Sequence, residues 1–230
     1  MDPKRLVILV EGDADERAVP SLVGRMLAER QGSDVLFVDG NVIATGGAKN
    51  LVTPKAIEDR NWERWLGAAL KRQDLGAVLL LADGDLDQVG KGKPFCPGRC
   101  ALGLSERART VGAGATFSVA SVFARQEYES WLIAGVGSMA GKELPNDLGR
   151  IAADVTPPSG DLEAAPRDAK KWLSQHAGIA YKPTIHQAVL TRQVDLALVR
   201  QRNLRSFQRL EKSLQALIEA MRSGKHVVTP

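Results

Sequence analysis

Three aspartates follow the most apolar run of the chain and are the first candidates for chemistry. Val78 to Ala82 are five consecutive apolar residues, and Asp83, Asp85 and Asp87 follow them at alternate positions. An uninterrupted apolar run predicts a strand buried on both faces of a parallel sheet, so Asp83 is expected at its carboxyl end, where α/β proteins bind ligands. Crowded like charges repel unless a cation lies among them, and Mg²⁺ and Mn²⁺ prefer carboxylate oxygens. The stretch therefore predicts a metal site.

An EF-hand loop and an ordinary acidic turn are other interpretations of these aspartates. An EF-hand loop also begins with alternate acids, but it needs glycine at its sixth position and glutamate at its twelfth. Here those positions hold Gln88 and Pro94, which excludes the EF-hand. An ordinary acidic turn with solvated aspartates stays open, because turns favour Asp and Gly.

A second acidic residue stands at the end of another apolar run. Residues 6–10 predict a first strand, and Glu11 follows it as Asp83 follows its own strand. Since the carboxyl ends of neighbouring parallel strands meet at one edge of a sheet, Glu11 and Asp83 are expected to lie together. The next acids, Asp13, Asp15 and Glu16, suit the start of the following helix, where carboxylates cap the backbone and interact favourably with the helix dipole.

Two glutamates come soon after a further predicted strand, residues 117–124. Glu127 and Glu129 are two positions apart. On a helix such residues point about 200° apart, so at most one of them is expected to face a metal. An exposed helix start, where glutamate is favourable, is the alternative.

The order of the predicted elements favours an α/β fold. Apolar strands alternate with helical segments, which is typical of a mainly parallel sheet flanked by helices. The Pro-Pro-Ser-Gly run at residues 157–160 indicates a linker. The helices predicted beyond it are Asp168–His176, Thr184–Arg200 and Phe207–Met221. We therefore expect an α/β domain over residues 1–155 and a C-terminal helical extension over residues 156–230 that packs on it.

The positive charge of the chain is concentrated in its last part. The 230 residues carry a formal net charge of +4, but from Arg192 onward eight Lys and Arg residues stand against three acidic ones, a local charge of +5. A basic helical end beside an acidic metal centre suits a polyanionic substrate. A solvated helix face is the alternative for such a basic run.

Composition and motifs exclude several classes of protein. A hydrophobic content of 44% is typical of a globular chain, and no stretch approaches the roughly 18–20 apolar residues that span a bilayer. No small-residue cleavage site follows the first apolar run, so we expect a cytoplasmic protein without a membrane partner. The glycine-rich residues 45–50 do not follow the G-x-x-x-x-G-K-[ST] pattern of a nucleotide-binding P-loop.

Several of these motifs, in this order, carry a resemblance to a known fold. They are VEGDADE at residues 10–16, LADGDLD at residues 81–87 and ARQEYESWLIA at residues 124–134. Together they resemble the Toprim-like fold, a Rossmann-type metal-binding α/β domain of topoisomerases, primases and OLD-type nucleases. With DAKKWL at 168–173, YKPTIHQ at 181–187 and RSFQRL at 205–210, nearly the whole chain resembles a bacterial Toprim-like family of unknown function. Its members are often encoded beside SMC/ABC-type ATPases in phage-defence loci.

The resemblance implies roles for individual residues. The implied metal ligands are Glu11, Asp83, Asp85, Asp87, Glu127 and Glu129, and the implied catalytic residues among them are Glu11, Asp83, Asp85 and Glu129. Glu11 would act as metal ligand or general acid–base. The implied substrate-binding residues, which would meet phosphates, are Lys170, Arg125 and Arg205.

The function expected on these grounds is a Mg²⁺- or Mn²⁺-dependent nuclease that cleaves DNA or RNA. The resemblance implies that it is the effector of a two-component anti-phage system with a separate AAA/ABC-type ATPase, and a homodimer is possible. Strand transfer of the topoisomerase type is not expected, since only Tyr128 and Tyr181 could serve as nucleophile. The alternative function is a non-catalytic regulatory or binding subunit that keeps the same metal site.

Overall fold

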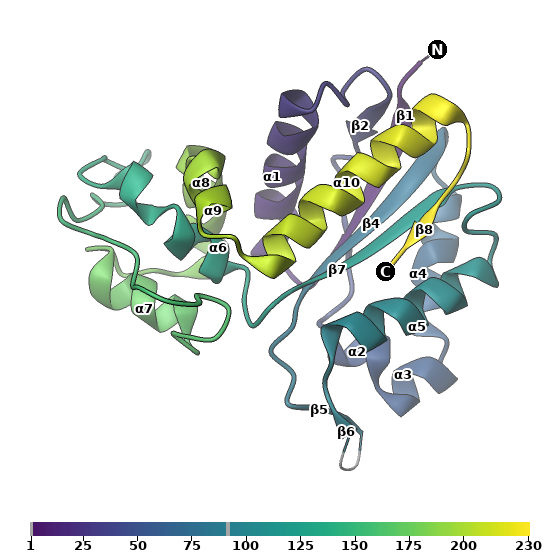
Figure 1. Cartoon of the computed structure of the whole chain (residues 1–230), viewed down its shortest axis with the longest axis horizontal. Coiled ribbons are helices and arrows are strands. Elements are labelled where there is room, and N and C mark those ends of the chain that lie inside the picture. Colours follow the sequence, from purple (N-terminus) through teal and green to yellow (C-terminus); the bar gives the residue numbers. More distant parts are fainter. Residues whose placement is uncertain (1, 91–92) are drawn as a thin grey trace.

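A computed structural model describes residues 2–90 and 93–230 of the chain (Figure 1). As predicted, it is an α/β structure with a parallel central sheet flanked by helices, consistent with a Rossmann-like fold. The sheet has the order β2-β1-β4-β7-β8, with β3 also paired to β1, and every pairing in it is parallel. Its strands are β1 (Lys4–Val10), β2 (Leu36–Val38), β3 (Ile43–Ala44), β4 (Leu75–Asp83), β7 (Ser118–Ala124) and β8 (Val228–Thr229). A separate antiparallel ribbon consists of β5 (Gln88–Gly90) and β6 (Lys93–Pro94).

Helices connect the strands and form most of the second half of the chain. The α-helices are α1 (Asp15–Glu29), α2 (Lys49–Val52), α3 (Pro54–Glu58), α4 (Asn61–Leu70), α5 (Pro97–Arg109), α6 (Glu129–Ala134), α7 (Ala169–His176), α8 (Ala188–Gln193), α9 (Leu196–Gln201) and α10 (Arg205–Ser223). A 3₁₀ turn, η1 (Val136–Met139), follows α6, and a π-helical turn, η2 (Pro183–Gln187), precedes α8. Within the described ranges, no helix has both the length and the apolar composition needed to cross a membrane.

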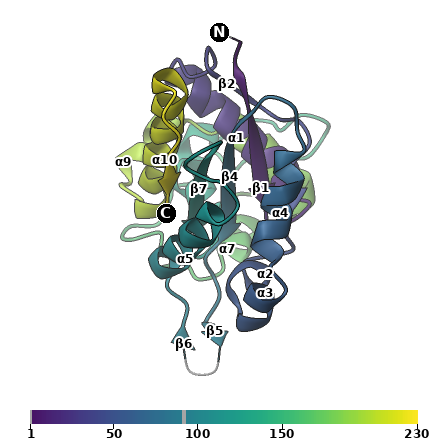
Figure 2. The same cartoon turned by 90° about the vertical axis from the view of Figure 1, so that its right-hand side faces the viewer.

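The apolar strand that precedes Asp83 is buried on both faces. Leu79 and Leu81 of β4 belong to the core on the side of α1 and α10, whereas Val78 and Leu80 belong to the core on the side of α4 and α5. Figure 2 shows α10 and α4 on opposite sides of the sheet. This two-sided burial explains why the run has no polar alternation. By the same alternation, Asp83 continues the row of Leu79 and Leu81 on the α1 side.

The C-terminal part of the chain returns to the sheet. Helix α10 packs along β7, and β8 pairs in parallel with β7. Leu22 of α1 and Leu214 of α10 belong to the same hydrophobic core, so residues on both sides of the expected boundary at residue 155 share one core. The two-residue strand β8 has too short a pattern to be predicted from sequence.

One predicted helix is interrupted. The segment Thr184–Arg200 was expected to form a single helix, but it consists of η2, α8 and α9. The backbone of Val194 is extended (φ −64°, ψ 135°), and the Asp195 side chain then accepts a 2.8 Å hydrogen bond from the Ala197 N–H at the start of α9. A capping aspartate restarts a helix in this way because it satisfies a backbone donor that the first turn leaves free.

The packing of α10 on the sheet predicts the effect of truncating one of its core residues. Leu210 is fully buried, so Leu210→Ala should lower the free energy of unfolding by about 2–5 kcal/mol. Lys212→Ala, on the exposed side of the same helix, should change it by less than about 0.5 kcal/mol. Urea denaturation measures both, and equal effects would contradict the packing of α10 described here.

Candidate active site

A cavity of about 330 Å³ opens at the carboxyl ends of β1 and β4. We call it the acidic cavity, because five carboxylates and one lysine line it: Glu11, Asp13, Asp15, Asp83, Glu129 and Lys170. These side chains come from the loop after β1, the first turn of α1, the end of β4, the start of α6 and the start of α7. The carboxyl edge of a parallel sheet is where α/β proteins bind their ligands.

Backbone hydrogen bonds fix the acids at the strand ends. The Asp83 N–H donates to Oε2 of Glu11 over 3.2 Å, and the Tyr128 N–H donates to Oδ1 of Asp83 over 2.8 Å. The loop after β1, the end of β4 and the segment after β7 are thus connected through two carboxylates. Gly47 lies against Glu11, and a Cβ atom there would approach Oε1 of Glu11 to 2.9 Å. A glycine at this position leaves room for the carboxylate.

The ammonium group of Lys170 lies among the carboxylates of three acidic side chains. Its Nζ lies 2.6 Å from Oε1 of Glu127, 3.9 Å from Oδ2 of Asp83 and 3.9 Å from Oε2 of Glu129. Glu127 also accepts a 2.8 Å hydrogen bond from the Ala169 N–H, so it anchors the start of α7. The positive charge of the ammonium group therefore stabilises the ionised forms of these three acids.

The acids of the cavity are nonetheless hard to ionise. Burial, and then the charge of Glu129, raise the pKa of Asp83 well above its usual range. Burial raises the pKa of Glu129 to about 7, although Lys170 acts in the opposite direction. Burial also raises the pKa values of Glu11 and Asp15. Burial is the first cause of each shift, and the charges of neighbouring carboxylates add to it at Asp83 and Glu11.

Some of the acids predicted from sequence lie in the acidic cavity and others do not. Glu11, Asp83 and Glu129 line it. Asp85 and Asp87 are exposed and do not line it, although the charge of Asp85 contributes to the raised pKa of Glu11. Of the two glutamates after β7, Glu129 faces the cavity, while Glu127 holds Lys170.

The predicted substrate-binding residues separate into two places. Lys170 lies in the acidic cavity, where it contacts carboxylates. Arg125 and Arg205 line a second cavity, between α5 and α10. The three basic residues therefore do not form one phosphate-binding group around the acids.

Asp15 is a site residue that sequence reasoning assigned to another role. It was expected as a capping and helix-dipole residue. Asp15 lies in the first turn of α1, as the dipole role requires, but α1 starts without a side-chain cap. Oδ1 of Asp15 accepts a 2.7 Å hydrogen bond from Nε2 of Gln187. Its pattern could have indicated the site, since Glu11, Asp13 and Asp15 alternate as the aspartates after β4 do. Tyr181 is a second residue of the site that was not predicted from the sequence. Its hydroxyl donates a 3.0 Å hydrogen bond to Oε1 of Glu129.

The chemistry of the acidic cavity fits a hard divalent cation. Its donors are carboxylate oxygens, the ligands that Mg²⁺ and Mn²⁺ prefer. In residues 2–90 and 93–230, no three His, Cys, Asp or Glu side chains are arranged as a ready metal-binding group. Lys170 stands between Asp83, Glu127 and Glu129, so a cation would compete with its ammonium group.

The fold and the cavity define a Rossmann-like α/β protein with an acidic site at the carboxyl edge of its sheet. Residues 10–215 match the model of a family described as "Domain of unknown function (DUF4276)", and the chain belongs to that family. No curated protein and no solved structure matches the chain.

The position of Lys170 predicts that removing its charge destabilises the protein. Lys170→Met leaves Glu127, Asp83 and Glu129 without their nearest cation. Because the Lys170 side chain is 39% exposed, we expect a loss of about 1–3 kcal/mol, less than the loss of a fully buried partner. Lys171→Met, at the exposed neighbouring position, is the control. Urea denaturation in EDTA measures both, and equal stabilities would argue against the central role of Lys170.

The raised pKa of Glu129 predicts a pH dependence of stability in metal-free buffer. Folding raises this pKa from 4.5 to about 7, so the folded protein binds the proton more tightly than the unfolded chain. The contribution to stability is complete below about pH 4.5 and is lost as the pH rises to about 7, at up to about 1.4 kcal/mol per pH unit. Glu129→Gln should flatten this part of the stability profile. If the variant and the wild type show the same slope in urea denaturation, Glu129 does not titrate in this way.

Proposed function

We propose that this protein is a Mg²⁺- or Mn²⁺-dependent nuclease that hydrolyses phosphodiester bonds of nucleic acid. The observation that carries the proposal is the convergence of Glu11, Asp83 and Glu129 on one cavity. They follow or end three adjacent parallel strands, β1, β4 and β7. Carboxylates gathered at the carboxyl edge of a parallel sheet are suited to hold divalent cations for phosphoryl chemistry.

The residues that would hold the cation are Glu11, Asp83 and Glu129, with Asp15 beside them. Asp85 stays a proposed further ligand, since it is exposed and close enough to influence Glu11. A cation bound there would supply the positive charge that lowers the pKa of a water molecule and stabilises charge on a phosphate.

The side chains of the cavity have separate proposed tasks in hydrolysis. Glu11 would take the proton of the attacking water as general base. Tyr181 orients Glu129 by donating a hydrogen bond to it. Once a cation neutralises the carboxylates, Lys170 would be available to pair with a substrate phosphate.

Hydrolysis by water is favoured over strand transfer through a tyrosine. Tyr128 and Tyr181 are both buried, and their hydroxyls are hydrogen-bonded to Thr191 and Glu129. Burial raises the pKa of both phenols. A buried phenol that resists ionisation is poorly suited to attack a phosphodiester.

The second candidate function is a non-catalytic regulatory or binding subunit, and the position of Lys170 favours it. An internal ammonium group already neutralises part of the cluster. If it does so permanently, the acids form a structural ion cluster rather than a metal centre. The two functions differ in one measurable property, because only the nuclease must bind a divalent cation in the acidic cavity.

The proposed biological setting rests on the resemblance to the Toprim-like defence family. We propose a cytoplasmic effector of an anti-phage system that acts with a separate AAA/ABC-type ATPase and can form a homodimer. Its substrate would be DNA or RNA. The net charge of +5 from Arg192 onward suits a polyanionic substrate of either kind.

Asp83→Asn is the sharpest test of the metal site. Asparagine keeps an oxygen that can accept the hydrogen bond of the Tyr128 N–H, whereas alanine would leave this donor without its partner. The substitution removes one of several repelling charges, so stability should hold or rise. Calorimetric binding of Mg²⁺ or Mn²⁺ should be lost, and so should cleavage of DNA or RNA where the wild type shows it.

Asp154→Asn serves as the matched control, because Asp154 is exposed and lies outside the acidic cavity. It should bind Mg²⁺ and Mn²⁺ as the wild type does. Wild-type protein that binds neither cation at about millimolar concentration would refute the metal site and favour the non-catalytic subunit.

A further inference from the structure

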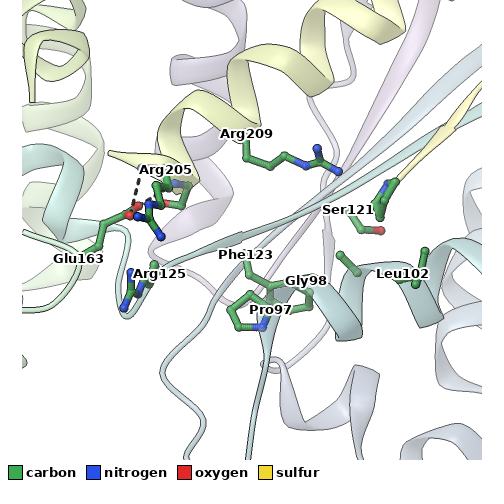
Figure 3. Close-up of a pocket in the computed structure, with 12 residues that line it drawn as sticks. Pro97, Gly98, Leu102, Ser121, Phe123, Arg125, Glu163, Arg205 and Arg209 are labelled. Atoms are coloured by element: carbon green, nitrogen blue, oxygen red, sulfur yellow. Dashed lines mark hydrogen bonds between the residues drawn. The ribbon is translucent and has the colours of Figure 1, made fainter. Parts of the chain in front are cut away.

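A second cavity, of about 460 Å³, lies between α5 and α10 beside β7 (Figure 3). We call it the arginine cavity. Its apolar lining includes Ala101, Leu102 and Phe123. Leu102 is 50% exposed, so the cavity presents apolar surface to solvent. The volume falls in the range of about 300–1,000 Å³ that is typical of small-molecule sites.

Three arginines line this apolar surface. Arg205 and Arg209 lie one turn apart on α10, and Arg125 follows the last residue of β7. Among the residues that the structure describes, the guanidinium groups of Arg205 and Arg209 form no ion pair. Arg125 is paired only with Asp161, at 3.9 Å and with both side chains about half exposed.

The one acidic side chain of the cavity already has partners. Glu163 is 1% exposed, and its carboxylate accepts hydrogen bonds from the backbone N–H groups of Arg205 (3.0 Å) and Ser206 (2.7 Å). It therefore satisfies the first turn of α10 rather than the arginines. The charged side chains that line the cavity are thus three arginines and one glutamate, and Pro230 lines it as well.

Ser121 gives a second, independent indication of a ligand. It lines the arginine cavity from β7 and is only 1% exposed. Its buried Oγ has no hydrogen-bond partner in the described part of the chain. A buried hydroxyl without a partner is unfavourable, and a polar ligand in the cavity would supply the missing partner. Figure 3 shows Ser121 at one end of the cavity and Arg125 and Arg205 at the other.

We propose that the arginine cavity binds a nucleoside phosphate. Guanidinium groups recognise phosphate oxygens in bidentate pairs, which accounts for the arginines. The apolar lining would accept the flat base, and arginine also stacks on planar rings. The Ser121 hydroxyl can donate to or accept from the polar edge of the base. A purely apolar ligand would leave Ser121 and the arginines unused, and a simple anion would leave the apolar lining unused.

The nucleoside phosphate can come from two sources with the same chemistry, a free nucleotide or one nucleotide of a bound strand. The inference does not rest on the proposed nuclease, because the arginine cavity shares no lining residue with the acidic cavity. Binding can therefore be measured in EDTA, where failure of the metal site has no influence on the result.

The experiment is calorimetric titration of the full-length protein in EDTA with AMP, GMP, CMP and UMP. A short 5′-phosphorylated single-stranded oligonucleotide is titrated in parallel. Adenosine, which lacks the phosphate, and inorganic phosphate, which lacks the nucleoside, serve as controls. Each should bind at least about tenfold more weakly than AMP. Binding of mononucleotides identifies the free nucleotide as a ligand, and binding of the oligonucleotide alone identifies the strand.

Two variants locate the binding in the arginine cavity. Arg209→Glu should weaken binding at least about tenfold, and Lys225→Glu, an equal charge change outside the cavity, should not. Ser121→Ala should weaken binding about fivefold while leaving the stability of the free protein equal or higher, since it removes an unpartnered hydroxyl. The proposal is overturned if no nucleotide probe binds at about millimolar concentration, if inorganic phosphate binds as tightly as AMP, or if both cavity variants bind as the wild type does.

Discussion

The structure at the edge of the sheet depends on the balance between buried carboxylates and one lysine. Asp83 and Glu129 lie where burial opposes ionisation, and each lies within 3.9 Å of the Lys170 ammonium. Buried charges persist in a fold only when they are paired and hydrogen-bonded. Glu127 holds Lys170 in place, and Glu11 and Asp83 accept backbone hydrogen bonds. The start of α7 is thereby tied to the sheet through charge as well as apolar packing.

The parallel sheet makes this concentration of charge possible. Adjacent strands β1, β4 and β7 run in the same direction, so the three segments that leave them emerge side by side. Both faces of the strands are covered by helices, and Val10 and Ala124, the last residues of β1 and β7, are fully buried. The same burial that stabilises the fold therefore raises the pKa values of the acids. A cation bound at such a site would favour the ionised form of these acids.

Much of this arrangement follows from local sequence patterns, and the remainder does not. The apolar runs predicted the main strands. The positions after these strands predicted that Glu11, Asp83 and Glu129 lie together, because parallel strands end at the same edge of the sheet. Spacing could not show that Asp85 and Asp87 turn outward, since the backbone after Gly84 leaves the strand direction. The role of Lys170 depends on a contact across 43 residues with Glu127, and no local period encodes such a contact. Asp15 was assigned to the helix start alone, because a carboxylate in the first turn of a helix gives no local sign that it also lines a cavity.

One short segment after β7 links the two cavities. Arg125 lines the arginine cavity, Glu127 holds Lys170, and Glu129 lines the acidic cavity. Arg125 and Glu127 lie between β7 and α6, and Glu129 is the first residue of α6. Gln126 has a positive φ of 68°, a conformation that residues other than glycine adopt rarely. Strain of this kind persists only where surrounding contacts over-determine the backbone. The hydrogen bond from the Tyr128 N–H to Asp83 and the ion pair of Glu127 with Lys170 are such contacts. The two cavities therefore draw lining residues from one short segment, whose backbone these contacts hold in place.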